Sequence, residues 1–126
     1  MSGAECSAYK ELDSADRSVN QGVGYKCDQD LTPGWYRFTG AAGTQMATSC
    51  VPQLHCGTQA TGWMNGALPS EDEGIVHRLV CYSYLENCCR WHSNIMVRNC
   101  GDYFVYKLVK PKECKLRYCG SHGDED

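Results

Sequence analysis

Cysteine is the residue type that most constrains this chain, because ten cysteines occur among its 126 residues. An even number of cysteines at this density in a short chain is typical of a disulfide framework. Disulfides form and persist in oxidising compartments, so the sequence predicts an extracellular or secreted protein. The cysteines are spread over nearly the whole length: Cys6, Cys27, Cys50, Cys56, Cys81, Cys88, Cys89, Cys100, Cys114 and Cys119.

The length predicts a single domain, with the cysteine framework occupying residues 6–119. We expect residues 1–5 to be an expression leader or a linker, and residues 120–126 to be an acidic tail or linker. No stretch approaches the roughly 20 apolar residues that a membrane span requires, and no apolar signal segment follows Met1. The net charge is −3 and no basic stripe occurs, so we expect neither a nucleic-acid partner nor membrane insertion.

The clearest strand signals lie in the C-terminal third. Trp91, Ile95 and Val97 would share one face of a strand, because side chains alternate with a period of two. A Gly-Asp turn separates this strand from a second alternating segment that ends at Val109. We therefore expect an antiparallel hairpin between Trp91 and Val109, followed by a short strand that begins at Leu116.

The rest of the chain gives weaker signals. Strands are predicted at residues 35–39 and 46–51, and an irregular arm with one helical turn is predicted at residues 5–24. Residues 58–74 are rich in glycine and are predicted to form a long loop, whereas residues 75–84 fit a helix or a strand. The expected fold is a small, β-rich α+β domain with five disulfides and irregular loops.

The cysteine spacing and the motifs between the cysteines resemble a known family. These features are Cys50-x5-Cys56, Cys81-x6-Cys88-Cys89-x10-Cys100, Cys114-x4-Cys119, Trp35-Tyr36-Arg37-Phe38-x-Gly40, Cys50-Val51-Pro52-x-x-His55-Cys56, Trp63-x-Asn65-Gly66, Asp72-Glu73-Gly74-Ile75-Val76 and Tyr103-x-Val105-Tyr106-x-Leu108. Together they are similar to the ten-cysteine extracellular module of uromodulin and the pancreatic zymogen-granule membrane glycoprotein. Related eight-cysteine modules occur in a liver zona-pellucida-type protein and in a von Willebrand D and EGF-repeat protein.

The disulfide pairing does not follow from the spacing. Ten cysteines permit roughly 945 complete pairings. Neighbouring side chains on a strand point to opposite faces, so Cys88 and Cys89 should bond to different partners. The family resemblance implies one complete pairing, which is Cys6–Cys100, Cys27–Cys114, Cys50–Cys88, Cys56–Cys119 and Cys81–Cys89.

The resemblance also implies a role for residues 63–66. In the family members this segment carries an N-glycan at the position of Asn65, and a high-mannose chain there is a ligand for the mannose-binding adhesin of type 1 fimbriae. Here Asn65 does not begin an Asn-x-Ser/Thr acceptor sequence, because Ala67 stands where the hydroxyl residue is needed. We therefore expect no N-glycan at Asn65. Either this family member has another role, or Ala67 is engineered to prevent glycosylation.

The sequence contains no complete set of catalytic residues. The segment from Cys88 to Ser93 is similar to the Cys-Cys-x-x-His-Asp helix motif of secreted phospholipases A2, but Ser93 replaces the acid and His92 falls on a predicted strand. A disulfide-bonded Cys56 cannot act as a nucleophile beside His55. No Cys-x2-Cys occurs for zinc, and the carboxylates of residues 71–73 favour a solvated turn over a calcium site. We expect a non-enzymatic protein without a metal or cofactor.

The predicted contact surface is the loop of residues 63–74, because long exposed loops on a rigid scaffold often carry function. Trp63 could instead be a buried anchor. We expect a presentation or recognition module whose partner is an extracellular protein, a glycan or a microbial surface. The alternatives are a lectin-like domain that binds carbohydrates or microbes, and a structural spacer beside EGF-like or zona-pellucida-type domains. The candidate residues are Trp63, Asn65, Glu71, Asp72 and Glu73.

Overall fold

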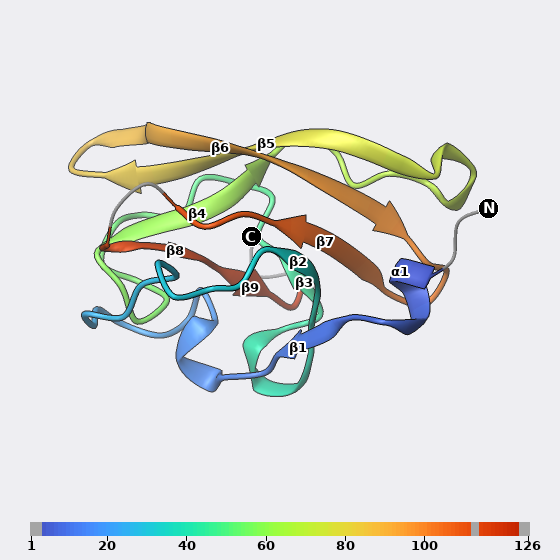
Figure 1. Cartoon of the computed structure of the whole chain (residues 1–126). Coiled ribbons are helices and arrows are strands. Elements are labelled where there is room, and N and C mark those ends of the chain that lie inside the picture. Colours follow the sequence, from blue (N-terminus) through green and yellow to red (C-terminus); the bar gives the residue numbers. More distant parts are fainter. Residues whose placement is uncertain (1–3, 112–113, 124–126) are drawn as a thin grey trace.

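Two β-sheets form the framework of the domain (Figure 1). The computed structural model describes residues 4–111 and 114–123, and the fold is given for these residues. The larger sheet has seven strands in the order β1-β2-β7-β6-β5-β4-β8, and the smaller sheet pairs β3 with β9. The strands are β1 (Lys10–Leu12), β2 (Gly34–Phe38), β3 (Gln45–Met46), β4 (Ala60–Asn65), β5 (Ile75–Tyr84), β6 (Asn87–Asn99), β7 (Phe104–Leu108), β8 (Leu116–Tyr118) and β9 (Gly120–Ser121).

Helical structure is short throughout the described residues. The helix α1 covers Ala4–Ser7, and 3₁₀ turns cover Ala15–Arg17, Gly40–Ala42 and Glu71–Glu73. The domain is therefore β-rich, as predicted, but the α+β description fits it only in part. None of the helices in residues 4–111 and 114–123 is long and apolar enough to cross a membrane.

The segment whose sequence fits either a helix or a strand forms β5. This strand pairs antiparallel with β4 on one side and with β6 on the other. The strands on both sides provide partners for the backbone N–H and C=O groups of β5. In a helix these groups would instead bond to one another within the segment. Its alternate residues Val80 and Tyr82 are completely buried. Leu85 follows β5 with a φ of 54°, a left-handed conformation that suits the tight turn into β6.

The predicted hairpin between Trp91 and Val109 is present in part. β6 pairs antiparallel with β7 only where Met96–Asn99 face Phe104–Lys107. The preceding part of β6, including Trp91, pairs with β5 instead. The sequence therefore predicted the β6–β7 connection, whereas it did not predict the larger β5–β6 hairpin.

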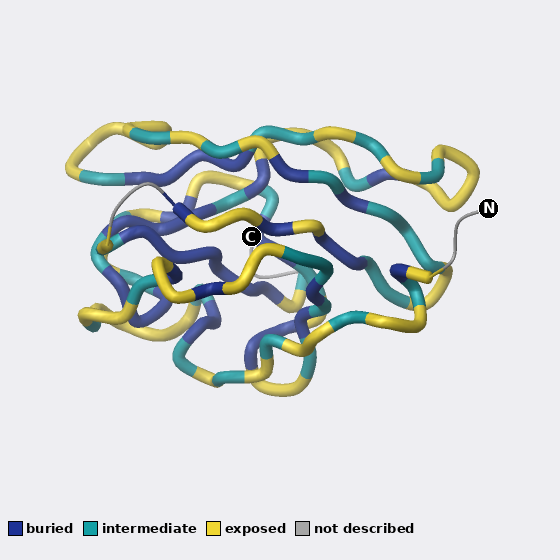
Figure 2. Tube along the Cα trace, in the orientation of Figure 1, coloured by how far each residue is buried: buried dark blue, intermediate teal, exposed yellow. Residues whose placement is uncertain are grey.

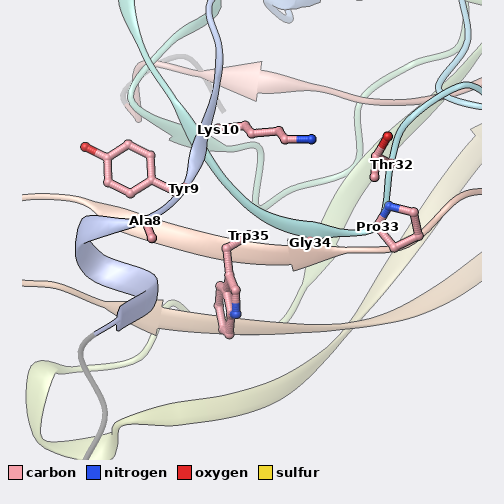
Figure 3. A pocket seen from close by; sticks show the side chains of 7 residues that line it. All are labelled: Ala8, Tyr9, Lys10, Thr32, Pro33, Gly34 and Trp35. Carbon is pink, nitrogen blue, oxygen red and sulfur yellow. The ribbon is translucent and has the colours of Figure 1, made fainter.

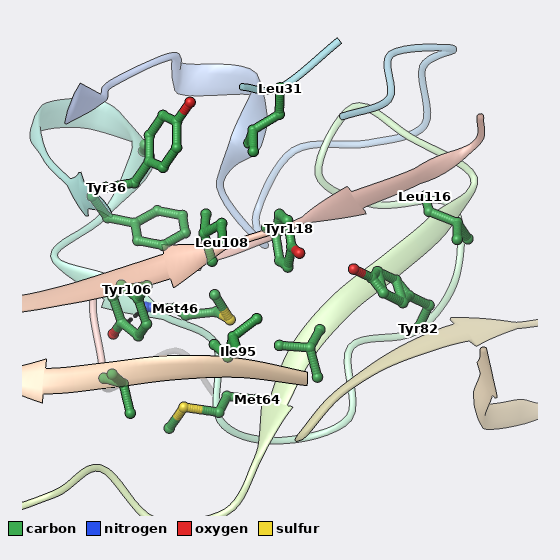
Figure 4. Packing of buried hydrophobic residues seen from close by; sticks show 14 of the residues in the cluster. Leu31, Tyr36, Met46, Met64, Tyr82, Ile95, Tyr106, Leu108, Leu116 and Tyr118 are labelled. Carbon is green, nitrogen blue, oxygen red and sulfur yellow. Dashed lines mark hydrogen bonds between the residues drawn. The ribbon is translucent and has the colours of Figure 1, made fainter. Parts of the chain in front are cut away.

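The hydrophobic core lies against one face of the large sheet, which we call the inner face (Figure 4). Val97, Tyr106 and Tyr36 are directly opposite one another on β6, β7 and β2, so their side chains share this face. The Tyr106 ring packs edge-to-face on Phe38 with 5.5 Å between ring centroids, and its hydroxyl oxygen accepts the backbone N–H of Met46 at 3.0 Å. Figure 2 shows that buried residues follow the central strands, whereas exposed residues concentrate at loops and hairpin ends.

The prediction of a long loop at residues 58–74 is wrong for the first part of this segment. β4 occupies Ala60–Asn65 and pairs antiparallel with β5 and parallel with β8. Gly62 within β4 is required by close packing: a Cβ there would lie 2.8 Å from the Arg117 carbonyl oxygen of β8. The glycine that suggested a loop therefore lets two strands approach each other.

Two other boundaries differ from the prediction. Of the strand predicted at residues 46–51, only Met46 lies in a strand, since β3 ends there. The domain also extends beyond residues 6–119, because Glu5 is buried against Arg98, and Gly120 and Ser121 form the buried β9. Residues 1–3 of the predicted leader and residues 124–126 of the predicted tail lie outside the described residues.

Five disulfides connect the described elements, and no described cysteine is free. The bonded cysteines have Cα atoms 4.6–5.8 Å apart, which is the usual range for disulfides. Cys88 and Cys89 of β6 bond to different partners, as the alternation of side chains requires. The pairs are those that the family resemblance implies: Cys6–Cys100, Cys27–Cys114, Cys50–Cys88, Cys56–Cys119 and Cys81–Cys89.

Candidate functional site

The predicted contact loop divides into two structural parts. Trp63 and Asn65 belong to β4, whereas Glu71–Glu73 form a 3₁₀ turn before β5. Because side chains alternate along β4, Trp63 and Asn65 project to the face opposite the buried Met64. This opposite side of the large sheet is called the outer face below.

Trp63 is an anchor of the outer face rather than a free contact residue. Its side chain is half-buried and packs against a second hydrophobic cluster that contains Val51, Cys56 and Cys119. Its indole N–H donates a hydrogen bond of 2.9 Å to the Cys88 carbonyl oxygen. A buried indole usually has such a partner, and the bond ties β4 to the β5–β6 hairpin. The structure thus supports the anchoring alternative for Trp63.

Asn65 lies at the accessible end of β4. Asn65, Gly66 and Ala67 are exposed, and the Asn65 amide nitrogen lies 3.7 Å from the Cys81 sulfur. The Ala67 carbonyl oxygen accepts a hydrogen bond of 2.8 Å from Arg78 Nε, which holds the chain directly after β4. Asn65 is therefore displayed on a fixed backbone.

The acidic turn Glu71–Glu73 is exposed but internally ordered. The Glu73 carboxylate accepts hydrogen bonds from the backbone N–H and the hydroxyl of Ser70, at 2.9 and 3.2 Å. The backbone hydrogen bond from Ser70 is the main reason that the pKa of Glu73 lies below its usual value. The Asn99 side chain donates to the Pro69 carbonyl oxygen at 3.1 Å, which fixes the turn against β6. Glu71 and Asp72 are thus presented to solvent.

The residues considered above for catalysis or metal binding lie in settings that differ from those that a catalytic or metal site needs. His55 contacts the Val19 carbonyl oxygen through Nδ1 at 3.1 Å, and the adjacent Cys56 is disulfide-bonded. His92 lies on strand β6 and is exposed, whereas the phospholipase motif that it resembles requires a helix. Within the described part of the chain, no three His, Cys, Asp or Glu side chains gather as metal ligands.

A further group of residues on the outer face was not predicted from the sequence. Trp35 of β2 is opposite Lys107 of β7, Lys107 is opposite Met96 of β6, and Met96 is opposite His77 of β5. A hollow of about 380 Å³ adjoins this row at Trp35 and extends to Tyr9 (Figure 3). The alternation within each strand predicts which residues share a face, but only the register places these four side chains in one row.

The described disulfides and the sheet define a class of protein, namely a small, disulfide-rich extracellular module. Residues 36–120 match the model of a domain family described as "Uromodulin-like". The chain is 49% identical over 115 residues to uromodulin of Mus musculus, an alignment that covers 90% of this chain and 18% of the relative. It is 42% identical over 116 residues to the pancreatic secretory granule membrane major glycoprotein GP2 of Canis lupus familiaris. This alignment covers 90% of this chain and 23% of the relative. The chain therefore belongs to the uromodulin-like domain family.

The human GP2 protein is a more distant relative, with 39% identity over 116 residues. The chain spans about a fifth of the length of these relatives. The similarity thus concerns one module of longer proteins, and neither relative is named as an enzyme. The disulfide framework and the family place the module outside the cell or in the secretory pathway.

Proposed function

We propose that this chain is a non-enzymatic presentation and recognition module of a longer mosaic glycoprotein, in which EGF-like or zona-pellucida-type domains flank it. The observation that carries the proposal is the acidic turn Glu71–Glu73, which a disulfide-fixed scaffold holds in the solvent. Its partner is an extracellular protein or a microbial surface. We expect neither a nucleic-acid partner nor membrane insertion by this module.

The rigidity of the acidic turn supports this role. Ser70 and Glu73 close the turn through side-chain hydrogen bonds, and Asn99 holds Pro69, which precedes Ser70. Asn99 is next to Cys100, which is bonded to Cys6. A preformed surface loses little conformational entropy when a partner binds, so even a small acidic surface can bind selectively.

The exposed polypeptide, rather than an N-glycan, is the presented surface. Asn65 is accessible at the end of β4, but Ala67 leaves it without an acceptor sequence. The adhesin-decoy role that the family resemblance implies depends on that glycan. We therefore infer that this chain retains the scaffold of a decoy and presents carboxylates in place of mannose.

Binding to intact mucosal bacteria and to basic extracellular proteins tests the proposal. The variant carrying Glu71→Lys and Asp72→Lys should lose most binding, and Glu73 is kept because it closes the turn. The matched control carries Asp13→Lys and Asp30→Lys, which change two exposed carboxylates elsewhere by the same net charge. Equal binding by both variants would remove the acidic turn from the proposal. A complete lack of partners would favour the structural spacer.

A lectin-like function is the second candidate, and the hollow beside Trp35 favours it. A glycan array probed with unglycosylated protein separates it from presentation by the acidic turn. Binding to arrayed glycans that survives Glu71→Lys and Asp72→Lys would support the lectin-like function.

A further inference from the structure

The outer face carries a strip of side chains that has no assigned role. Its first row consists of Trp35, Lys107, Met96 and His77, on β2, β7, β6 and β5. Opposed residues of antiparallel strands project to the same face. Lys107 and His77 are exposed, whereas Trp35 and Met96 are half-buried. The row therefore combines an apolar floor with two polar groups that reach into the solvent.

Two adjoining hollows follow this strip. One hollow of about 250 Å³ is lined by His77, Asn94, Met96 and Lys107 among others, and it begins at Pro33. The second hollow, of about 380 Å³, shares Pro33 and contains Trp35. Figure 3 shows the Trp35 indole on the opposite side of β2 from Lys10. Pro33 lines both hollows, and the groove named below is the outer-face strip from Trp35 past Lys107 to His77 with the hollow beside it.

The groove is positive although the whole chain carries a net charge of −3. Lys107 lines it, Lys10 lies on the other side of β2 from Trp35, and no described Asp or Glu lines either hollow. None of the ion pairs between described residues involves Lys107. The Lys107 ammonium is therefore available to a negatively charged ligand.

We propose that this groove binds an anionic oligosaccharide. The acidic group of the sugar pairs with Lys107, and its hydroxyl groups exchange hydrogen bonds with Asn94 and His77. The apolar face of a sugar ring lies on Trp35 and Pro33. A few polar groups placed around an apolar floor are the usual composition of a ligand site. This proposal makes the lectin-like candidate specific and rests on it, and because the site is separate from the acidic turn it holds or fails independently of the presentation role.

The geometry favours a sugar over an acidic peptide. Extended peptides bind most readily by adding a strand to an unpaired sheet edge. Met96 and His77 lie on β6 and β5, each of which has a neighbouring strand on both sides. A peptide backbone would find no ladder to join there, whereas a sugar needs only side-chain groups and an apolar surface.

Titration of the disulfide-bonded chain with 3′-sialyllactose and with heparin tetrasaccharide tests the proposal, with neutral lactose as the reference sugar. The measurements are calorimetry and tryptophan fluorescence. Either anionic sugar should bind saturably and change the fluorescence, and Trp35→Phe should abolish the fluorescence change. Lys107→Gln should weaken binding by about tenfold, the effect of losing one charge-assisted hydrogen bond.

The matched control is Lys26→Gln, which removes an exposed lysine that belongs to neither hollow. This variant should bind like the parent chain, and circular dichroism should show that all variants remain folded. Three outcomes would overturn the proposal: no binding of either anionic sugar at millimolar concentration, binding of lactose with equal affinity, or a folded Lys107→Gln variant with unchanged affinity. Binding of an oligoglutamate peptide without sugar binding would assign the groove to a protein partner and also overturn it.

Discussion

Arg17 and Asp28 form a buried, bidentate ion pair that joins the N-terminal arm to β8. Arg17 Nη1 and Nη2 donate to the two Asp28 carboxylate oxygens, each at 2.9 Å. The two side chains are only 8% and 5% exposed. Arg17 also donates to the Tyr118 carbonyl oxygen at 2.9 Å, and the Tyr118 N–H donates to Asp28 at 2.8 Å. Each charged group is thus paired with the other and hydrogen-bonded to the β8 backbone.

Removal of one member of this pair should strongly destabilise the domain. Asp28→Ala leaves the Arg17 guanidinium buried without a counter-charge, which costs about 3–5 kcal/mol of unfolding free energy. Urea unfolding with the disulfides intact measures this loss. The double variant Arg17→Met with Asp28→Leu should be more stable than Asp28→Ala, because it leaves no unpaired charge at this site. A loss below about 1 kcal/mol for Asp28→Ala would contradict the role of the pair.

Substitution of Gly120 should disrupt the junction between the two sheets. A Cβ at this position would lie 2.0 Å from the Ala42 carbonyl oxygen and 2.9 Å from the Phe38 ring. Backbone atoms cannot yield as side-chain ends do, so Gly120→Ala should cost about 3 kcal/mol or more. Gly22→Ala is the matched control, since nothing lies within 4 Å of its Cβ. Thermal unfolding should separate the two variants clearly, and equal midpoints would refute the argument.

The domain should lose stability in acid, in part through Asp16. Burial raises the pKa of Asp16, but hydrogen bonds from Lys26 and Ser14 and the charge of Arg117 outweigh burial and hold it well below its usual range. The unfolded chain therefore takes up this proton first, at a pH of about 4. The stabilisation is complete above that pH and disappears as the pH falls through the folded-state pKa.

Unfolding midpoints measured from neutral pH down to about pH 2 test this contribution. Asp16→Asn should be less stable than the parent chain at neutral pH, and its midpoint should fall less steeply below about pH 4. The comparison variant is Asp30→Asn, which changes an exposed aspartate. Parallel curves for Asp16→Asn and the parent chain would show that Asp16 does not contribute.

Restoration of the acceptor sequence should permit glycosylation of Asn65. Ala67→Thr creates Asn-Gly-Thr at an exposed strand end, where an oligosaccharyltransferase can reach the amide. Mass spectrometry of protein secreted from a eukaryotic host should detect one N-glycan, which should be absent when Asn65→Gln is added. An unmodified Ala67→Thr variant would question the match of this segment to the glycan-bearing segment of the relatives.

Peptide mapping without reduction tests the disulfide framework in the oxidised protein. Cleavage between the cysteines should yield linked peptides for the five pairs of the structure. Cys81–Cys89 spans only eight positions, so its identification requires cleavage within that loop. A peptide with a Cys88–Cys89 bond would contradict both the structure and the alternation of side chains on β6.

The sequence itself determined the features that depend on local chemistry. The ten cysteines indicated an oxidised, extracellular module, and the alternation around Ile95, with weaker strand signals at Trp35 and Leu116, indicated strands that the structure contains. These predictions succeeded because they depend on composition and on the alternation of neighbouring side chains, both of which can be read from the sequence directly. The motifs between the cysteines indicated the family that the comparisons then showed.

Only the tertiary structure decided which distant residues meet. It placed Gly62 in a paired strand. This could not be predicted, because a glycine in the sequence does not show that β8 will pack closely against it. It made Trp63 an anchor by bringing the Cys88 carbonyl oxygen to its indole. It also aligned Trp35, Lys107 and His77 on one face, because strand register depends on long-range pairing and packing that no local pattern contains.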